Sequence, residues 1–267
     1  MRTLSQLMDM RGRVALITGG AGHIGQAAAE ALAEMGAAVA VLDLDSDKCE
    51  GVCEDLRKKF LGQTMPLAVD LADAEVVRAV PAKVVGRLGR LDVLIHCAAL
   101  VGTSSLKGWA VPFADQSLDS WRSAMDVNLA SAFVLSQAAA EALGAFGHGS
   151  IINVSSIYGL VGPDMRLYEG TAAGNPAAYG ASKAGLLQLT RYLATVLTPK
   201  VRVNALTPGG VLRGQDPEFQ KRYVSRTPLG RMAVEEDLKG AFAYLASDLS
   251  AYVTGQNLVV DGGWTAW

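Results

Sequence analysis

A tyrosine and a lysine stand four residues apart in the run Tyr179-Gly-Ala-Ser-Lys183. Residues at i and i+4 share a face of a helix, so the Lys183 ammonium can lie near the Tyr179 phenol and favour its ionised form. A phenol with a pKa of about 10 is a poor base at neutral pH unless a cation lowers that pKa. The pair therefore predicts acid and base chemistry centred on Tyr179.

A glycine-rich turn at residues 18–25, T-G-G-A-G-H-I-G, joins an expected strand to an expected helix. Gly19, Gly22 and Gly25 are three residues apart, with His23 at a variable position. Glycines let the backbone approach a pyrophosphate, which the amides and dipole of the helix N-terminus stabilise. The turn therefore predicts a dinucleotide site, and we interpret His23 as a half-packed or exposed residue without chemistry.

An acidic residue, Asp43, ends the second expected strand, 18 residues after Gly25. A carboxylate there can accept hydrogen bonds from the adenosine ribose hydroxyls. It would repel a 2′-phosphate, so NAD is favoured over NADP. Asp45 and Lys48 stand nearby and leave NADP open as the alternative.

Two serines, Ser155 and Ser156, end another expected strand upstream of the Tyr-Lys helix. A hydroxyl at this place can hydrogen-bond a reacting oxygen. By itself a Y-x-x-x-K spacing is a common surface pair. After Ser-Ser, in a nucleotide-binding α/β chain, it favours catalysis.

Short β-branched runs alternate with longer Ala-rich helical stretches along the whole chain. The expected strands are 14–18, 38–42, 65–69, 93–96, 150–154, 201–206 and 257–260. The expected helices include 24–35, 73–88, 118–143 and 176–197. This alternation predicts an α/β fold: a Rossmann-type, doubly wound parallel sheet of about seven strands with helices on both faces. No linker or repeat divides the chain, so we expect one domain over residues 1–267.

Three segments, 100–116, 159–175 and 208–232, are longer than ordinary connections. Each follows an expected strand and so leaves the carboxyl edge of the sheet, where ligands of open α/β folds bind. We expect these segments to form the substrate side of the site.

The composition excludes several classes of protein. The 267 residues are 50% hydrophobic and 19% charged, with a net charge of −2. This balance offers no basic footprint for nucleic acid or an anionic membrane, and no apolar run is long enough to span one. Three cysteines, an odd number, favour a reducing cytoplasm over a disulfide framework. Cys49 and Cys53 share one expected helix without further ligands nearby, so no metal site is expected.

Taken together, the motifs resemble the short-chain dehydrogenase/reductase family over nearly the whole chain. The matching segments are 18–25, Asp43, Asp70-Leu71, Asp126-Val127-Asn128, Asn153-Val154-Ser155-Ser156, 179–183, Arg202-Val203-Asn204, Pro208-Gly209 and V-T-G-Q-N-L-V-V-D-G-G at 253–263. The resemblance implies hydride transfer between nicotinamide and a secondary alcohol or its ketone, with the cofactor supplying the chemistry.

The resemblance also implies roles for individual residues. Tyr179 would be the general acid and base, and Ser156 would hold the reacting oxygen. Lys183 would bind the nicotinamide ribose and lower the Tyr179 pKa, and Asn128 would position a water for proton relay. The implied cofactor contacts are Gly19, Gly22, Ile24, Gly25, Asp43, Asp70, Leu71, Ala98, Tyr179, Lys183, Pro208, Gly209 and Val211.

Three features depart from the family pattern. The usual Asn-Asn-Ala-Gly after the fourth strand is His96-Cys97-Ala98-Ala99, so an Asn that often stabilises the sheet is absent. Arg213 stands where many relatives have a Thr that touches the nicotinamide amide. Ser156 and Tyr179 are 23 residues apart, which is longer than usual by about one loop.

For the inserted loop 159–175, two interpretations stay open: a substrate-binding role, and a surface elaboration or subunit contact. The candidate substrate residues Arg166, Tyr168, Glu169 and Arg213 suit a hydroxylated or anionic molecule. Arg222 and Arg226 stand near Arg213 and could help to clamp a phosphate or carboxylate. The loop and the C-terminal residues are also similar to a bacterial subgroup linked to flagellin and surface-polysaccharide sugars. A sugar or sugar phosphate is therefore an expected substrate.

Two other functions stay open. Nucleotide-sugar epimerases and dehydratases share the T-G-x-x-G-x-x-G turn, but their chains normally continue into a second lobe. A non-catalytic NAD sensor or scaffold would keep the fold and lose the chemistry. The resemblance further implies a homo-oligomer, a dimer or a tetramer, formed through helices 118–143 and 176–197.

Overall fold

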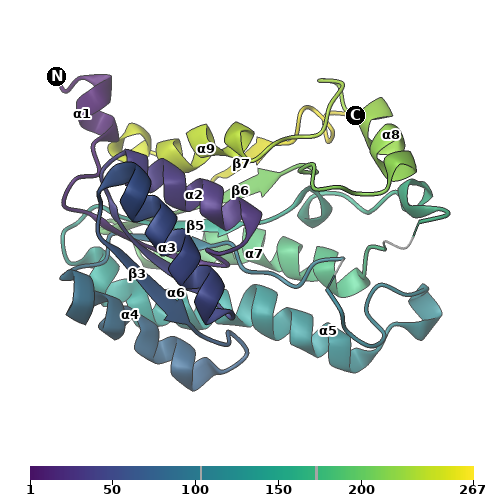
Figure 1. Cartoon of the computed structure of the whole chain (residues 1–267), viewed down its shortest axis with the longest axis horizontal. Helices are drawn as coiled ribbons and strands as arrows, with labels where there is room; N and C mark the ends of the chain where they lie inside the picture. The colour runs from purple at the N-terminus through teal and green to yellow at the C-terminus, as the bar shows by residue number, and fades with distance from the viewer. Residues whose placement is uncertain (103, 172–173) are drawn as a thin grey trace.

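The chain folds around one seven-stranded parallel sheet with the order β3-β2-β1-β4-β5-β6-β7 (Figure 1). In this computed structural model, residues 1–102, 104–171 and 174–267 are described. The strands are β1 (Val14–Thr18), β2 (Ala38–Asp43), β3 (Thr64–Ala68), β4 (Val93–His96), β5 (Gly149–Val154), β6 (Val201–Pro208) and β7 (Asn257–Val260). The strand order reverses between β1 and β4, as in doubly wound sheets. The predicted fold class is confirmed.

Helices cover both faces of this sheet (Figure 1). The longer ones are α2 (His23–Glu34), α3 (Ser46–Phe60), α4 (Ala74–Leu88), α5 (Leu118–Met125), α6 (Ser131–Gly144), α7 (Ala177–Val196), α8 (Pro217–Ser225) and α9 (Glu236–Ala246). The short ones are α1 (Leu4–Met8), η1 (Phe113–Asp115), the π-helical turn η2 (Asp126–Ala130), η3 (Ile157–Gly159), η4 (Met165–Tyr168) and η5 (Asp248–Ser250). Within the described ranges, no helix is long and apolar enough to cross a membrane, and no group of three or more potential ligand residues could hold a metal ion.

The inner strands β1, β2, β4, β5 and β6 bury one set of side chains on each face, because successive side chains point to opposite sides. Leu16 and Ile17 of β1 are both fully buried, but they belong to different cores. Ile17 packs in the core that includes Phe242 of α9, together with residues of α2 and α3. Leu16 packs in the core that includes Leu135 of α6, together with residues of α4 and α7. The continuous apolar strands of the sequence thus reflect burial on both faces.

One predicted helix is interrupted. The sequence predicted a single helix over 118–143, but the structure has α5, the π-helical turn η2 and α6. In this turn the amide of Ser131 donates to the carbonyl oxygen of Asp126, five residues earlier. The turn buries Asn128, whose Oδ1 accepts a hydrogen bond of 2.7 Å from the amide of Leu100. Periodicity alone could not predict this turn, because it depends on a contact with a distant loop.

The amino end of β1 is joined to the start of β4 by a buried carboxylate. Asp92 Oδ2 accepts a hydrogen bond of 2.9 Å from the amide of Val14 and another of 2.7 Å from Arg90 Nε. Asp92 Oδ1 accepts a third, of 2.6 Å, from Arg90 Nη2. The Asp92 carboxylate therefore accepts hydrogen bonds both from the first amide of β1 and from Arg90, which lies just before β4.

We expect Asp92→Ala to lower the free energy of unfolding by about 3 kcal/mol, because it leaves a charged partner and a buried amide without an acceptor. Urea denaturation measures this loss. Asp119→Ala is the matched control, since Asp119 is 95% exposed and only loosely paired with Arg122; its effect should stay within about 0.5 kcal/mol. Equal effects of the two substitutions would contradict the role assigned to Asp92.

Candidate active site

The glycine turn leaves the carboxyl end of β1 and opens α2. Gly19 has a φ of +63°, and a Cβ there would lie 2.7 Å from the Cα of Ala98. At Gly25 a Cβ would overlap the carbonyl oxygen of Gly19. Gly22 is the N-cap of α2 and has no side chain to bond the first-turn amides, which include that of Ile24. Small residues thus form a cradle, and free amides line it, as an anionic group requires.

Asp43 lies beside this cradle at the end of β2. Its carboxylate accepts hydrogen bonds from the amides of Ala21, at 3.1 Å, and Leu44, at 2.8 Å. Each carboxylate oxygen has two lone pairs, so acceptor capacity remains on both. Asp70 and Leu71 follow the neighbouring strand β3, with Asp70 exposed and Leu71 buried. The three predicted cofactor residues therefore gather at one end of the sheet.

The end of β4 closes the cradle from the other side. Thr18 Oγ1 accepts hydrogen bonds from the amides of Cys97, at 3.2 Å, and Ala98, at 3.3 Å. His96 is buried and its Nε2 lies 2.9 Å from Ser136 Oγ. Burial lowers the His96 pKa to about 3, so the ring is neutral at physiological pH. The His-Cys-Ala-Ala departure is thus accommodated by a neutral ring bonded to α6.

The carboxyl end of β5 brings Ser156 near the Tyr-Lys helix. Ser155 Oγ donates a hydrogen bond of 2.8 Å to the carbonyl oxygen of Lys183, and Lys183 Nζ donates one of 2.7 Å to the carbonyl oxygen of Val154. In one bond the donor follows β5 and the acceptor lies in α7, and in the other the donor lies in α7 and the acceptor in β5. A Cβ on Gly159 would lie 2.8 Å from the carbonyl carbon of Lys183, so a glycine allows this close approach.

The pKa shifts of the pair differ from the sequence-based expectation. Burial lowers the pKa of Lys183 to about 8. Burial also raises the pKa of Tyr179, although a hydrogen bond with Ser156 and the charge of Arg213 act in the opposite direction. The Lys183 Nζ lies 6.0 Å from the centre of the Tyr179 ring and is bonded to Val154 instead. In this structure the pKa of Tyr179 is raised overall, because desolvation outweighs the groups that favour the phenolate.

Asn128, in the π-helical turn, lies close to α7. Its Nδ2 donates hydrogen bonds to Ser182 Oγ, at 3.1 Å, and to the carbonyl oxygen of Leu100, at 3.2 Å. Ser182 Oγ in turn donates to the carbonyl oxygen of Tyr179 at 2.9 Å. The structure thus links Asn128 to the first turn of α7 and to segment 100–116.

Segment 159–175 packs against α8 and the C-terminal residues rather than lying free. Its described part contributes to an aromatic cluster in which Tyr168 contacts Phe219, and Tyr223 stacks on Trp264. The larger cluster comprises Ile157, Leu167, Phe219, Tyr223, Met232 and Trp264, with Tyr158, Tyr168 and Val224 at its border. Segments 100–116 and 159–175 include residues 103, 172 and 173, which lie outside the described residues.

A chain of polar groups runs from this segment toward the site. Asn175 Nδ2 donates a hydrogen bond of 3.3 Å to the Tyr168 hydroxyl, which donates one of 2.9 Å to the Tyr158 hydroxyl. Tyr158 was not predicted from the sequence, although its position two residues after Ser156 is the signal that could have identified it. Its amide donates to Ser156 Oγ at 3.2 Å.

Most arginines near the site are already engaged. Arg166 and Arg226 both pair with Asp164. Arg222 donates to the backbone carbonyls of Arg166, at 3.2 Å, and Glu169, at 2.6 Å. These contacts join segment 159–175 to α8, so the guanidinium groups of Arg166, Arg222 and Arg226 have structural partners.

The remaining predicted residues line the end of β6. Pro208 ends the strand, and the amide of Gly209 donates to the carbonyl oxygen of Val260 at 2.9 Å. Val211 is buried and pairs with Ala233. Arg213 follows, with its Nε 3.6 Å from Glu235 Oε1. Cofactor and catalytic candidates therefore meet along one edge of the sheet.

Comparison with known proteins agrees with this geometry. The family model described as "Enoyl-(Acyl carrier protein) reductase" matches residues 19–265. The chain is 37% identical over 260 residues to trans-4-hydroxycyclohexanecarboxylate dehydrogenase of Sinomonas cyclohexanicum, which covers 95% of this chain and 93% of that one. It is 35% identical over 267 residues to the probable galactose dehydrogenase of Rhizobium meliloti (strain 1021), with 97% of both chains covered.

A similar solved structure is that of a gluconate 5-dehydrogenase from Burkholderia cenocepacia J2315, in complex with NADP and tartrate. It has a TM-score of 0.87 and 30% identity, and the match covers 99% of this chain and 100% of that one. The chain therefore belongs to the short-chain dehydrogenase/reductase family and is a nicotinamide-dependent oxidoreductase that acts on the CH–OH group of a secondary alcohol or on the corresponding ketone.

Proposed function

We propose that this enzyme uses NAD and that Tyr179 exchanges the proton with the substrate oxygen, which Ser156 holds. The nicotinamide ring supplies the hydride chemistry when bound. The proposal rests above all on one observation: reciprocal hydrogen bonds of Val154 and Ser155 with Lys183 join the end of β5, which Ser156 follows, to α7, which carries Tyr179. In the proposal Lys183 orients the nicotinamide ribose, and Asn128 positions a water for proton relay.

The protonation state of Tyr179 sets what it can do in each direction. Its raised pKa keeps the phenol neutral, which suits a proton donor during ketone reduction. Alcohol oxidation needs the phenolate, so a positive charge must be added near the ring. Arg213 already favours the phenolate, and the oxidised nicotinamide is a second cation.

We expect Tyr179→Phe to lower kcat by about 10²- to 10⁴-fold, because the proton is no longer transferred by a positioned group. The Kd for NAD, measured by calorimetry, should stay unchanged. Tyr252→Phe is the control, because Tyr252 is fully exposed. A parent protein that binds NAD but converts no alcohol or ketone would support the sensor or scaffold alternative instead.

The preference for NAD is the finer part of this proposal, since the gluconate dehydrogenase structure contains NADP. It is supported by the Asp43 carboxylate beside the glycine turn, which has acceptor capacity left for ribose hydroxyls and would repel a 2′-phosphate.

Asp43→Ser should weaken NAD binding by about tenfold or more, because charge-assisted hydrogen bonds to the ribose are lost, and should shift the NAD to NADP preference toward NADP. The ratio of the two Kd values checks this. Asp47→Ser is the matched control, since Asp47 is an exposed acid in the first turn of α3. An unchanged ratio would show that the ribose contact is elsewhere.

For the substrate, we propose a secondary alcohol of a polyhydroxylated molecule, such as a sugar or sugar acid. The Asn175-Tyr168-Tyr158 hydrogen-bond chain supports this, because its end can donate to a second oxygen beside the reacting one. In this proposal Tyr168 acts by orienting the Tyr158 hydroxyl. Substrate roles for Arg166 and Glu169 stay predictions.

NADH formation with galactose, gluconate, trans-4-hydroxycyclohexanecarboxylate and simple secondary alcohols tests this substrate class. We expect the polyhydroxylated or carboxylated compounds to show kcat/KM values at least tenfold higher than those of simple secondary alcohols. Turnover confined to simple alcohols would contradict the sugar assignment.

We also propose a cytoplasmic homo-oligomer, a tetramer in the simplest case. Exposed apolar side chains on α5, α6 and α7 support an interface there; they are Leu118, Trp121, Phe133, Tyr192 and Val196. The three free thiols support a reducing compartment. Light scattering of the purified protein measures the number of subunits.

A further inference from the structure

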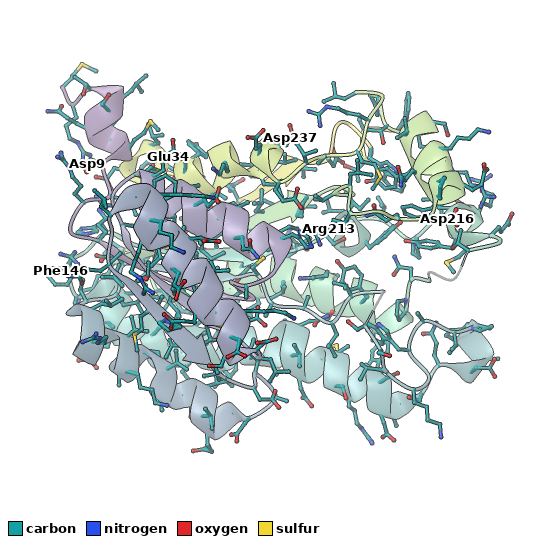
Figure 2. The ribbon with its side chains drawn as sticks, in the orientation of Figure 1. Asp9, Glu34, Phe146, Arg213, Asp216 and Asp237 are labelled. Carbon is teal, nitrogen blue, oxygen red and sulfur yellow. The ribbon has the colours of Figure 1, made fainter. Side chains whose placement is uncertain are left out.

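A chain of three polar side chains crosses from the glycine turn to segment 208–232. His23 Nδ1, in the first turn of α2, lies 3.4 Å from Glu235 Oε1. The same oxygen lies 3.6 Å from Arg213 Nε. Figure 2 shows Arg213 beside the end of α2 and well apart from Asp216 at the start of α8. Glu235 therefore connects the Arg213 guanidinium to His23, in the first turn of the helix that opens at the dinucleotide cradle.

The backbone fixes this position. The amide of Leu212 donates a hydrogen bond of 2.9 Å to the carbonyl oxygen of Ala233, and the amide of Ala233 donates one of 3.0 Å to Gly210. The two bonds hold the residues before Arg213 against those before Glu235. Glu235 is the N-cap of α9, which packs alongside α2. The ends of two packed helices and the end of β6 thus converge at Arg213.

Arg213 differs from the other arginines of this region in its donors. Arg166, Arg222, Arg226 and Arg231 donate hydrogen bonds to carboxylates or backbone carbonyls. By contrast, the Arg213 side chain makes no hydrogen bond within the part of the chain that the structure describes, and its contact with Glu235 is only an ion pair. Its planar fork of donors is therefore available for an anion.

The position of Glu235 explains why a cation is needed near the glycine turn. A carboxylate near the N-terminus of α2 repels the anion that the glycine cradle is built to bind. Arg213 neutralises that carboxylate, and its side chain, 32% exposed, still faces solvent in part. The positive charge of Arg213 also acts to lower the pKa values of Cys97, which follows β4, and of Tyr179. Arg213 thus interacts electrostatically with residues at both the β4 end and the Tyr-Lys helix.

Building on the proposed function, we infer that Arg213 binds the cofactor pyrophosphate, moving its free donors onto the phosphate oxygens, while Glu235 competes for the same guanidinium. Arg213 is in this view a cofactor residue rather than the substrate residue that the sequence suggested. Glu235 then sets how tightly the cofactor is held, because each cofactor molecule must displace part of an existing ion pair.

The experiment compares ligands with and without a pyrophosphate. We measure the Kd of NAD, ADP-ribose and adenosine by calorimetry for the parent, Arg213→Met, Arg213→Lys and Glu235→Gln. For Arg213→Met we expect NAD and ADP-ribose to bind about tenfold or more weakly, because charge-assisted hydrogen bonds are lost. Adenosine should be unaffected, and Arg213→Lys should recover part of the loss. Arg222→Met is the control, since Arg222 bonds backbone carbonyls of segment 159–175.

For Glu235→Gln we expect the opposite change in cofactor affinity. Removing the competing carboxylate should tighten NAD and ADP-ribose several-fold and leave adenosine unchanged. A purely structural role of Arg213 would instead weaken all three ligands together.

Three results would overturn the inference. The first is an unchanged NAD Kd in Arg213→Met, and the second is an equal loss for adenosine. The third is an effect confined to the KM of an anionic alcohol such as gluconate, which would assign Arg213 to the substrate. Failure of the proposed function looks different, because the parent protein itself would then bind neither NAD nor ADP-ribose.

Discussion

The hydrogen bond from Lys183 Nζ to the carbonyl oxygen of Val154 joins α7 to the central strand β5 and positions the candidate catalytic residues around it. A buried ammonium is costly unless it is bonded, and here the acceptor is the last carbonyl of a central strand. Because Ser155 returns a bond to the Lys183 carbonyl, β5 and α7 have one favourable register. The positions of Ser156 and Tyr179 depend on that register, because Ser156 directly follows Ser155 and Tyr179 lies one helical turn before Lys183.

The same edge of the sheet also supports the cofactor side. Thr18 bonds the amides that follow β4, so the glycine turn and the start of segment 100–116 share one anchor. Asn128 bonds both Leu100 and Ser182, which ties that segment to α7. The glycine turn and α7 are therefore parts of one hydrogen-bonded network, so a displacement of one would shift the other.

The inserted segment is the main element that this chain adds to the family pattern. It has been built into the fold by aromatic packing against α8 and by the ion pairs of Asp164. Polar and conformationally restricting residues suit that rigid arrangement better than flexible filler would.

The sequence by itself determined the fold class, because the alternation of apolar strands and amphipathic helices is a local signal that the backbone must obey. It also determined the composition of the candidate site, since the glycine turn, Asp43 and the Tyr179 to Lys183 run are short motifs. Strand boundaries differed by at most two residues, as expected where fraying is governed by neighbours.

Only the tertiary structure decided how distant residues act on one another. The direction of the Tyr179 pKa shift follows chiefly from burial, which is not visible in the i, i+4 spacing. The contact between Asn128 of the π-helical turn and Leu100 joins residues far apart in the chain, as does the approach of Glu235 to His23. The Tyr158 hydroxyl chain joins residues of one loop that no regular periodicity brings together. Such contacts depend on packing and electrostatics in three dimensions, which sequence patterns do not encode locally.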